Sequence, residues 1–114
     1  LKLFYENKNN LLSKKSYDFF WKTNRETTTA LSRIRGLLPK ETIVAHKSGS
    51  SGTNKDTGIM DAVNNIGIVF LPNREYFYIS VFVTKSYENP QTNDKIIADI
   101  SKAAYDFYTN TDKL

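Results

Sequence analysis

The sequence contains no cysteine and only one histidine, and these shortages exclude several kinds of chemistry. Without cysteine, the 114 residues form no disulfide and supply no thiolate nucleophile or metal ligand. His46, as the single histidine, cannot build a zinc site of the HExxH type, which needs two imidazoles on one helix. We therefore expect neither a metal nor an organic cofactor.

Long apolar runs and runs of like charge are also missing. No stretch is apolar over the roughly 20 residues that a membrane-spanning helix needs, so no membrane partner is predicted. The net charge of +4 comes from 16 basic and 12 acidic residues that are interspersed, which does not favour nucleic-acid binding. The opening LKLFYENKNN has neither a start methionine nor an apolar signal region, so we expect the chain to begin inside a longer protein.

What the sequence does contain indicates a packed fold with helices at both ends. Hydrophobic residues make up 39% of the chain and aromatic residues 13%, which is typical of a protein with a core. Ser13 is placed to cap a helix over about residues 13–25. A second helix is predicted over about 93–109, capped by Thr92 or Asn93. Its expected apolar face comprises Ile96, Ile100, Ala103, Ala104 and Phe107, widened by Ile97 and Tyr108.

Three strands are predicted between these helices, over about residues 41–47, 64–71 and 75–85. Pro72-Asn73 indicates a tight turn, so the last two strands should form an antiparallel hairpin. The fold class is therefore α+β, with an antiparallel sheet covered by helices. One apolar strand edge, most simply that of residues 75–85, would lack a partner. We expect an incomplete domain whose sheet is completed by more of the same protein or by a second copy.

The stretch HKSGSSG, at the end of the first predicted strand, combines a lysine, hydroxyls and glycines. Alternation along a strand would place Lys47 on the face opposite His46, so we expect His46 to pack in the interior. Lys47 and Ser48 are suited to binding a carboxylate, whereas Gly49 allows a ligand to approach the backbone and Ser50 offers its N–H to an oxyanion. The tripeptide alone is short, and an ordinary turn would explain it equally well.

The context of this tripeptide resembles the C-terminal part of class A β-lactamases over nearly the whole chain. Lys47, Ser48 and Gly49 match the K-[ST]-G box of that family. RIRGLLPKETIVAHKSG resembles the segment that leads into the box strand, LLSKKSYDFFWK the helix before it, and NNIGIVFLP the strand after it. The resemblance implies the C-terminal portion of the β-lactamase and transpeptidase-like fold.

The resemblance also implies roles for individual residues. Lys47 would anchor the β-lactam carboxylate and set the electrostatics near the nucleophile, and Ser48 would hydrogen-bond that carboxylate. Ser50 would give its N–H to the oxyanion hole, with Gly49 beside it. Many members carry a carboxylate-binding arginine on the strand after the box; that strand has none here, so Arg33 becomes the candidate and Arg35 is assigned a structural role at its turn.

Two kinds of departure from the family pattern stand out. The usual Asn-Asp before the second strand reads Asn64-Asn65, and the residue before the box lysine, often acidic, is His46. No serine has a lysine three residues later and no S-D-N triplet occurs, so the nucleophile is not in this segment. By resemblance we expect the segment alone to be inactive, although it belongs to a serine hydrolase that confers antibiotic resistance.

Two other interpretations remain open at this point. The chain could belong to a penicillin-binding or non-catalytic homologue, which an upstream deacylation glutamate would distinguish. It could also be a module that associates with itself through the open sheet edge, and a concentration-dependent dimer would indicate this. The expected partners are β-lactam antibiotics and the remainder of the β-lactamase chain or a second copy. By resemblance alone, the expected localisation is periplasmic or secreted.

Overall fold

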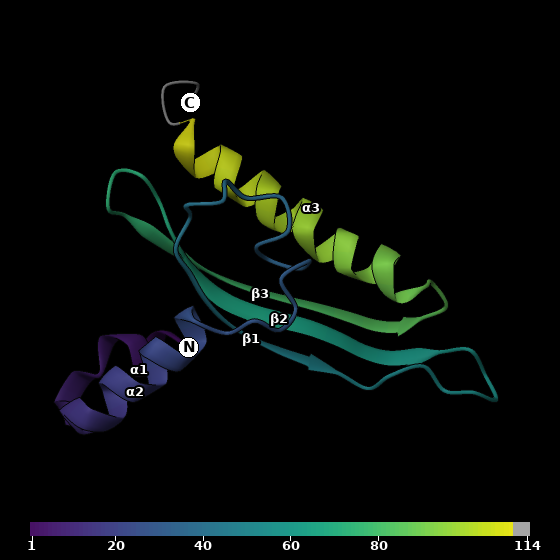
Figure 1. Cartoon of the computed structure of the whole chain (residues 1–114), viewed down its shortest axis with the longest axis horizontal. Helices are drawn as coiled ribbons and strands as arrows, with labels where there is room; N and C mark the ends of the chain where they lie inside the picture. Colours follow the sequence, from purple (N-terminus) through teal and green to yellow (C-terminus); the bar gives the residue numbers. More distant parts are fainter. Residues whose placement is uncertain (111–114) are drawn as a thin grey trace.

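A computed structural model describes residues 1–110 and contains the expected antiparallel sheet (Figure 1). Its three strands are β1 (Val44–Ser50), β2 (Met60–Phe70) and β3 (Tyr76–Ser86), and β2 lies in the centre. β2 and β3 form the hairpin predicted around Pro72-Asn73. Within the described residues both β1 and β3 are edge strands, as expected for β3. The α+β class is therefore confirmed.

The position of β1 differs from the prediction of residues 41–47. The chain turns at Pro39, whose carbonyl accepts the Thr42 N–H at 3.0 Å, and the strand starts only at Val44. It continues through the glycine- and serine-containing stretch because Ser48–Ser50 pair with Val63–Asn65 of β2. Pairing thus overrides the low strand propensity of Gly and Ser. The candidate site lies inside a strand rather than beyond its tip.

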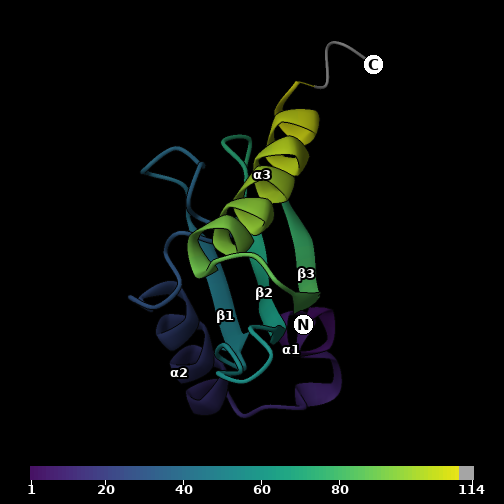
Figure 2. The same cartoon turned by 90° about the vertical axis from the view of Figure 1, so that its right-hand side faces the viewer.

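Helices cover the two faces of the sheet unequally (Figures 1 and 2). α3 (Pro90–Thr109) runs along one face, where it packs on β2 and β3. On the other face, α1 (Lys2–Glu6), a 3-10 turn (Lys8–Asn10) and α2 (Lys14–Arg25) lie together near one end. α2 begins where predicted, because the Ser13 hydroxyl accepts the N–H of the third helical residue at 3.2 Å.

The predicted start of α3 was wrong, and its inner face was predicted only in part: Ile97 is buried and Ala104 packs against the core, as expected. The helix starts at Pro90, three residues before the predicted 93, because proline is well suited to the first helical position and Asn89 supplies the cap. Small side chains face the sheet and allow close packing, so the buried residues of α3 are Asn93, Ile97, Ala98, Ser101 and Tyr105. Ile96, Ile100 and Phe107 are instead 38%, 46% and 53% exposed.

Two apolar clusters lie on opposite faces of the sheet. The cluster under α3 contains the alternate residues of the strands that point to that helix, among them Val44, Val63, Val69 and Val81, together with Ile34 and Ile97. The cluster under α2 contains Trp21, Ala45 and Ile68, with the rings of Tyr5, Tyr17 and Tyr78 packed around them. Both clusters combine helix and strand residues, so they fix the helices to the sheet.

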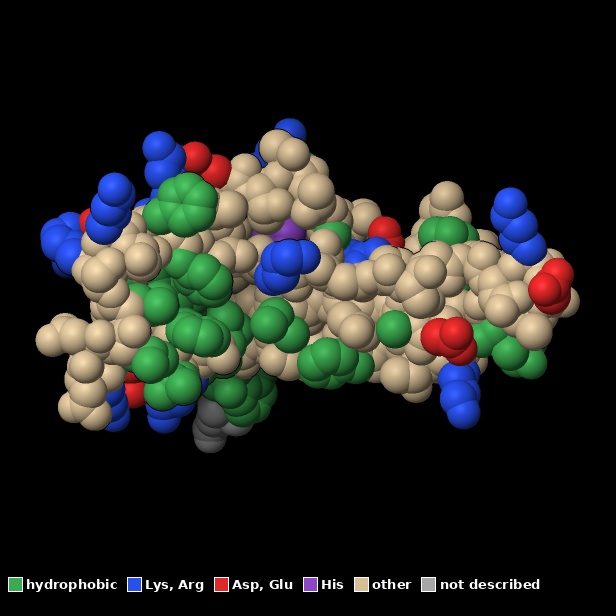
Figure 3. Space-filling model, turned by 90° about the horizontal axis from the view of Figure 1, so that it is seen from below, with side chains coloured by type: hydrophobic (Ala, Val, Ile, Leu, Met, Phe, Trp, Pro, Cys, Tyr) green, Lys and Arg blue, Asp and Glu red, His purple; other side chains and the backbone are tan. Residues whose placement is uncertain are grey.

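The face that carries α1 and α2 is covered only in part. Figure 3 shows hydrophobic side chains gathered on the left, where these helices lie, and fewer along the rest of this side. Farther along β3, Phe82 is 62% exposed. Among the described residues, no helix is long and apolar enough to cross a membrane.

The Asn89 cap provides a test of how α3 is anchored. The Asn89 side chain accepts the Thr92 N–H at 2.8 Å, and its removal leaves that donor without a partner. Asn89→Ala should therefore lower the free energy of unfolding by about 1 kcal/mol, measured by urea denaturation. Gln91→Ala is the matched control, because Gln91 is exposed and its side chain makes no hydrogen bond within residues 1–110. Equal losses in the two variants would contradict a capping role.

Candidate active site

Among residues 1–110, the outer edge of β1 presents backbone groups without strand partners. In an antiparallel pair, residues that bond to the neighbouring strand alternate with residues whose N–H and C=O point away. Ile43 accepts from Phe70 at 3.0 Å and Ser51 donates to Ala62 at 2.9 Å, so odd-numbered residues bond to β2. The N–H groups of Ser48 and Ser50 therefore point to the free edge.

The predicted site residues lie on both sides of this edge. Val44 belongs to the cluster under α3, so alternation puts Ser48 and Ser50 on that face and Lys47 and Gly49 on the opposite one. Lys47 is exposed, donates only to the carbonyl of Ser48, and makes no ion pair among residues 1–110. An ammonium group and two outward N–H groups thus face the same open space, an arrangement suited to an anion.

Arg33 reaches the same part of β1 from the face that carries α3. Its Nη1 donates to the carbonyls of Gly49 and Asn64 at 3.1 and 3.0 Å, and its Nε to Asp94 Oδ1 at 2.8 Å. The Arg33 side chain is only 11% exposed, so the guanidinium is held in one orientation. Its Nη2 has no hydrogen-bond partner among the described residues. Arg35 instead donates to the Thr42 carbonyl at 3.1 Å, consistent with its expected structural role.

Asp94 is the residue of this group that the sequence did not indicate. It accepts from Arg33 and, at 2.6 Å, from the hydroxyl of Ser32. Asp94 lies 61 residues after Arg33, on α3, where an acidic residue looks like any solvent-exposed helix position. Only the packing of α3 across the sheet brings the two charges together, so no local pattern could have found this pair.

His46 is packed in the interior, as predicted. It is 2% exposed, and its Nδ1 lies 3.3 Å from Nδ2 of Asn65. Burial, followed by the nearby positive charge of Arg35, lowers the pKa of His46 to about 4. The imidazole next to Lys47 is therefore neutral at pH 7 and adds no charge to the edge.

The buried His46 should make the chain less stable in acid. The folded pKa lies below the unfolded value of 6.5, so the unfolded chain takes up a proton first and stability is lost as the pH falls below 6.5. Between pH 7 and pH 5 the loss should be about 2 kcal/mol, measured by urea unfolding. An NMR titration of this single imidazole checks the cause, with the urea-unfolded chain as control. A folded-state pKa near 6.5 would contradict the assignment.

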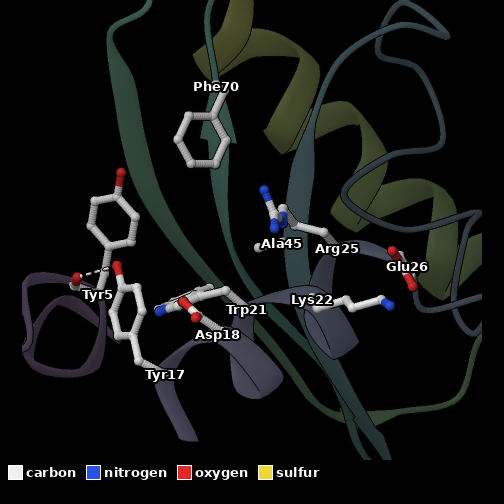
Figure 4. Close-up of a pocket in the computed structure, with 9 residues that line it drawn as sticks. All are labelled: Tyr5, Tyr17, Asp18, Trp21, Lys22, Arg25, Glu26, Ala45 and Phe70. Atoms are coloured by element: carbon white, nitrogen blue, oxygen red, sulfur yellow. Dashed lines mark hydrogen bonds between the residues drawn. The ribbon is translucent and has the colours of Figure 1, made fainter. Parts of the chain in front are cut away.

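A hollow of about 470 Å³ lies beside β1 on the face that carries α2. Figure 4 shows the rings of Tyr5 and Tyr17 on one side, Trp21 between the helix and the sheet, and Arg25 on the other side. Tyr17 donates to the Tyr5 carbonyl at 2.8 Å, which fixes one wall. Lys47, Ser48, Gly49, Ser50 and Arg33 do not line this hollow. The free edge of β1, rather than this hollow, brings the predicted site residues together.

Comparison with known sequences finds a match along almost the entire chain. Residues 1–108 match the family described as the beta-lactamase enzyme family. The chain is 56% identical to beta-lactamase VEB-1 of Pseudomonas aeruginosa over 106 residues, which are 93% of this chain and 35% of that protein. It is 44% identical to the extended-spectrum beta-lactamase PER-1 of Pseudomonas aeruginosa over 96 residues, or 84% of this chain and 30% of that protein. The chain thus spans about a third of the length of these relatives.

Solved structures agree with the sequence matches. The crystal structure of the TLA-1 extended-spectrum beta-lactamase superposes with a TM-score of 0.88 at 52% identity, covering 95% of this chain and 38% of that one. A class A beta-lactamase from Bacteroides cellulosilyticus superposes equally well, with a TM-score of 0.88 at 39% identity, covering 96% of this chain and 39% of that one.

Proposed function

The chain belongs to the class A members of the beta-lactamase enzyme family, and from this premise we propose that it forms the C-terminal wall of an active site that hydrolyses the amide bond of β-lactam antibiotics. The observation that carries the proposal is the outer edge of β1, where an ammonium group that makes no ion pair among residues 1–110 and outward N–H groups occur together. The homologous relatives are named as beta-lactamases, which supports the same chemistry.

Each candidate residue has a proposed role in this site. Lys47 attracts the carboxylate of the substrate and stabilises negative charge near the nucleophile, and Ser48 hydrogen-bonds that carboxylate. Ser50 donates its N–H to the lactam oxygen as the carbonyl becomes tetrahedral, and Gly49 leaves space for the approach. Arg33 offers its free Nη2 to the carboxylate from the other face of β1.

The proposed reaction needs a serine that these residues do not supply. A serine oxygen adds to the lactam carbonyl, the C–N bond breaks and the ring nitrogen takes a proton; water then hydrolyses the ester and restores the serine. No serine here has a lysine three residues later, so we assign the nucleophile to the part of the relatives outside the match. We accordingly propose that this chain alone is not acylated, and that the parent enzyme is periplasmic or secreted.

Supplying the remaining part of the enzyme tests the proposal. In a chimera, this chain replaces the matching 106-residue segment of VEB-1, and hydrolysis of benzylpenicillin is measured. We expect turnover by the chimera, and none by the VEB-1 remainder without the segment. The intact mass of the isolated 13.1 kDa chain, after mixing with a slowly hydrolysed β-lactam, should be unchanged. A folded but inactive chimera would contradict the proposed wall, and an adduct on the isolated chain would contradict the missing nucleophile.

A further inference from the structure

Asn65 joins the two segments that carry the candidate carboxylate-binding residues. Its Oδ1 accepts the Ile34 N–H at 3.1 Å, and its Nδ2 donates to the Lys47 carbonyl at 3.0 Å. Asn65 is 0% exposed, so removing its side chain takes from the buried Ile34 N–H the hydrogen-bond partner it has here. One buried amide therefore connects the residue after Arg33 to the backbone of Lys47.

The surroundings leave this connection little freedom to relax. Gly67 lies opposite His46 in the β1–β2 pair, and a Cβ there would be 3.1 Å from the His46 Cβ and 3.3 Å from the Ile34 Cδ1. β1, β2 and the segment that contains Ile34 are thus packed at close contact around Asn65. Asn65, two residues before Gly67 on the same strand, supplies the hydrogen bonds that join these segments, so removing its side chain loosens their relative position.

The contact between Asn65 and His46 depends on a neutral imidazole. Nδ2 of Asn65, which donates to the Lys47 carbonyl, also lies 3.3 Å from Nδ1 of His46, so that ring nitrogen accepts and the proton sits on Nε2. The charged group that acts on His46 is Arg35, which is positive. The amide at 65 and the imidazole at 46 are also the two positions at which the sequence departs from the acidic pattern expected by resemblance. Their contact indicates that the two departures form one neutral pair.

We propose that Asn65 is a positioning residue that sets the distance between Lys47 and Arg33 across the proposed β-lactam carboxylate site. It acts through the backbone of Lys47 and of Ile34 and does not touch the substrate. The inference rests on the proposed function. Loss of Asn65 should affect carboxylate binding selectively. A shift between the two segments that carry Lys47 and Arg33 weakens binding of the carboxylate more than it slows reaction at the lactam ring.

The test compares two substrates in the VEB-1 chimera, benzylpenicillin and its methyl ester, which lacks the carboxylate charge. Asn65→Ala should raise KM for benzylpenicillin about tenfold and leave kcat and the ester kinetics within about twofold. Asn65→Asp keeps the acceptor for the Ile34 N–H but loses the donor to the Lys47 carbonyl. Its KM for benzylpenicillin should therefore lie between that of the unsubstituted chimera and that of Asn65→Ala. Val69→Ala, a buried truncation on the same strand, is the control for lost stability.

A spectroscopic measurement tests whether residue 65 contacts His46 as described. In the isolated chain, Asn65→Asp places a carboxylate against His46 and should raise the pKa of the single imidazole, followed by NMR, whereas Val69→Ala should not. Equal losses for both substrates in Asn65→Ala and Val69→Ala would overturn the positioning role, and an unshifted imidazole would contradict the contact between residue 65 and His46. An unsubstituted chimera that hydrolyses neither substrate would instead overturn the proposed function, and this inference with it.

Discussion

Replacing Lys47 with alanine in the VEB-1 chimera should lower kcat/KM for benzylpenicillin about a hundredfold and leave the fold intact. The ammonium group makes no ion pair with the described residues and bonds only to the neighbouring Ser48 carbonyl, so folding does not depend on it. Removing a charge that meets an anionic substrate in a desolvated site costs roughly 2–5 kcal/mol. Steady-state kinetics measures the loss, and a thermal melt of the same sample measures the fold.

Lys102 provides the control for the loss of one positive charge. Among residues 1–110 it pairs only with Asp106, on the exposed side of α3, so Lys102→Ala should change kcat/KM by less than about twofold. Lys47→Arg adds a second comparison, because it keeps the charge but replaces the compact ammonium with a planar group. If Lys47→Ala retains most of the activity while Arg33→Ala does not, the carboxylate anchor would have to be assigned to Arg33 alone.

Local patterns predicted the elements that depend on nearby residues. The cap and aromatic spacing of α2 and the turn between β2 and β3 each lie within a few positions, where propensity and turn chemistry act. The inner face of α3 was predicted only in part because the helix has apolar residues on two sides. Ile97 rather than Ile96 faces the sheet because the small residues Ala98 and Ser101 lie on its side and let the helix approach the strands. The periodicity of large apolar residues does not take such small residues into account.

In the candidate site, too, residues close together in the sequence could be predicted and contacts between distant residues could not. Lys47 to Ser50 are contiguous, so a short motif could indicate them, and the resemblance added Arg33. The groups that hold these residues are far apart in sequence: Asp94 reaches Arg33 across 61 positions, and Asn65 reaches Ile34 across 31. Such contacts arise from the packing of α3 and β2 against the segment before β1. The sequence therefore indicates which residues could bind, whereas the structure explains their orientation.

Gly36→Ala should be among the most destabilising single changes in the chain. A Cβ at this position would lie 2.4 Å from the Ser32 carbonyl oxygen and 2.8 Å from its carbon, and both are backbone atoms that cannot rotate away. The turn is tight because the Gly36 N–H bonds to the Arg33 carbonyl at 2.8 Å. We expect the free energy of unfolding to fall by about 3 kcal/mol, measured by urea denaturation. Unchanged stability would mean that the turn around Gly36 is looser than described.

Gly49→Ala should have the opposite effect to Gly36→Ala: it should lower the activity of the chimera and leave its stability almost unchanged. The two variants therefore separate an effect on folding from an effect on function. A Cβ at Gly49 would meet nothing within 4 Å, so stability should change by less than about 0.5 kcal/mol. The added methyl group would stand on the Lys47 side of β1, where the proposed substrate approaches, so kcat/KM of the chimera should fall about tenfold. Gly36 shapes the turn that positions Arg33, whereas Gly49 faces the proposed ligand. An active-site wall therefore requires that Gly36→Ala lowers stability and that Gly49→Ala lowers activity at unchanged stability. An active, stable Gly49→Ala variant would move the proposed substrate away from β1.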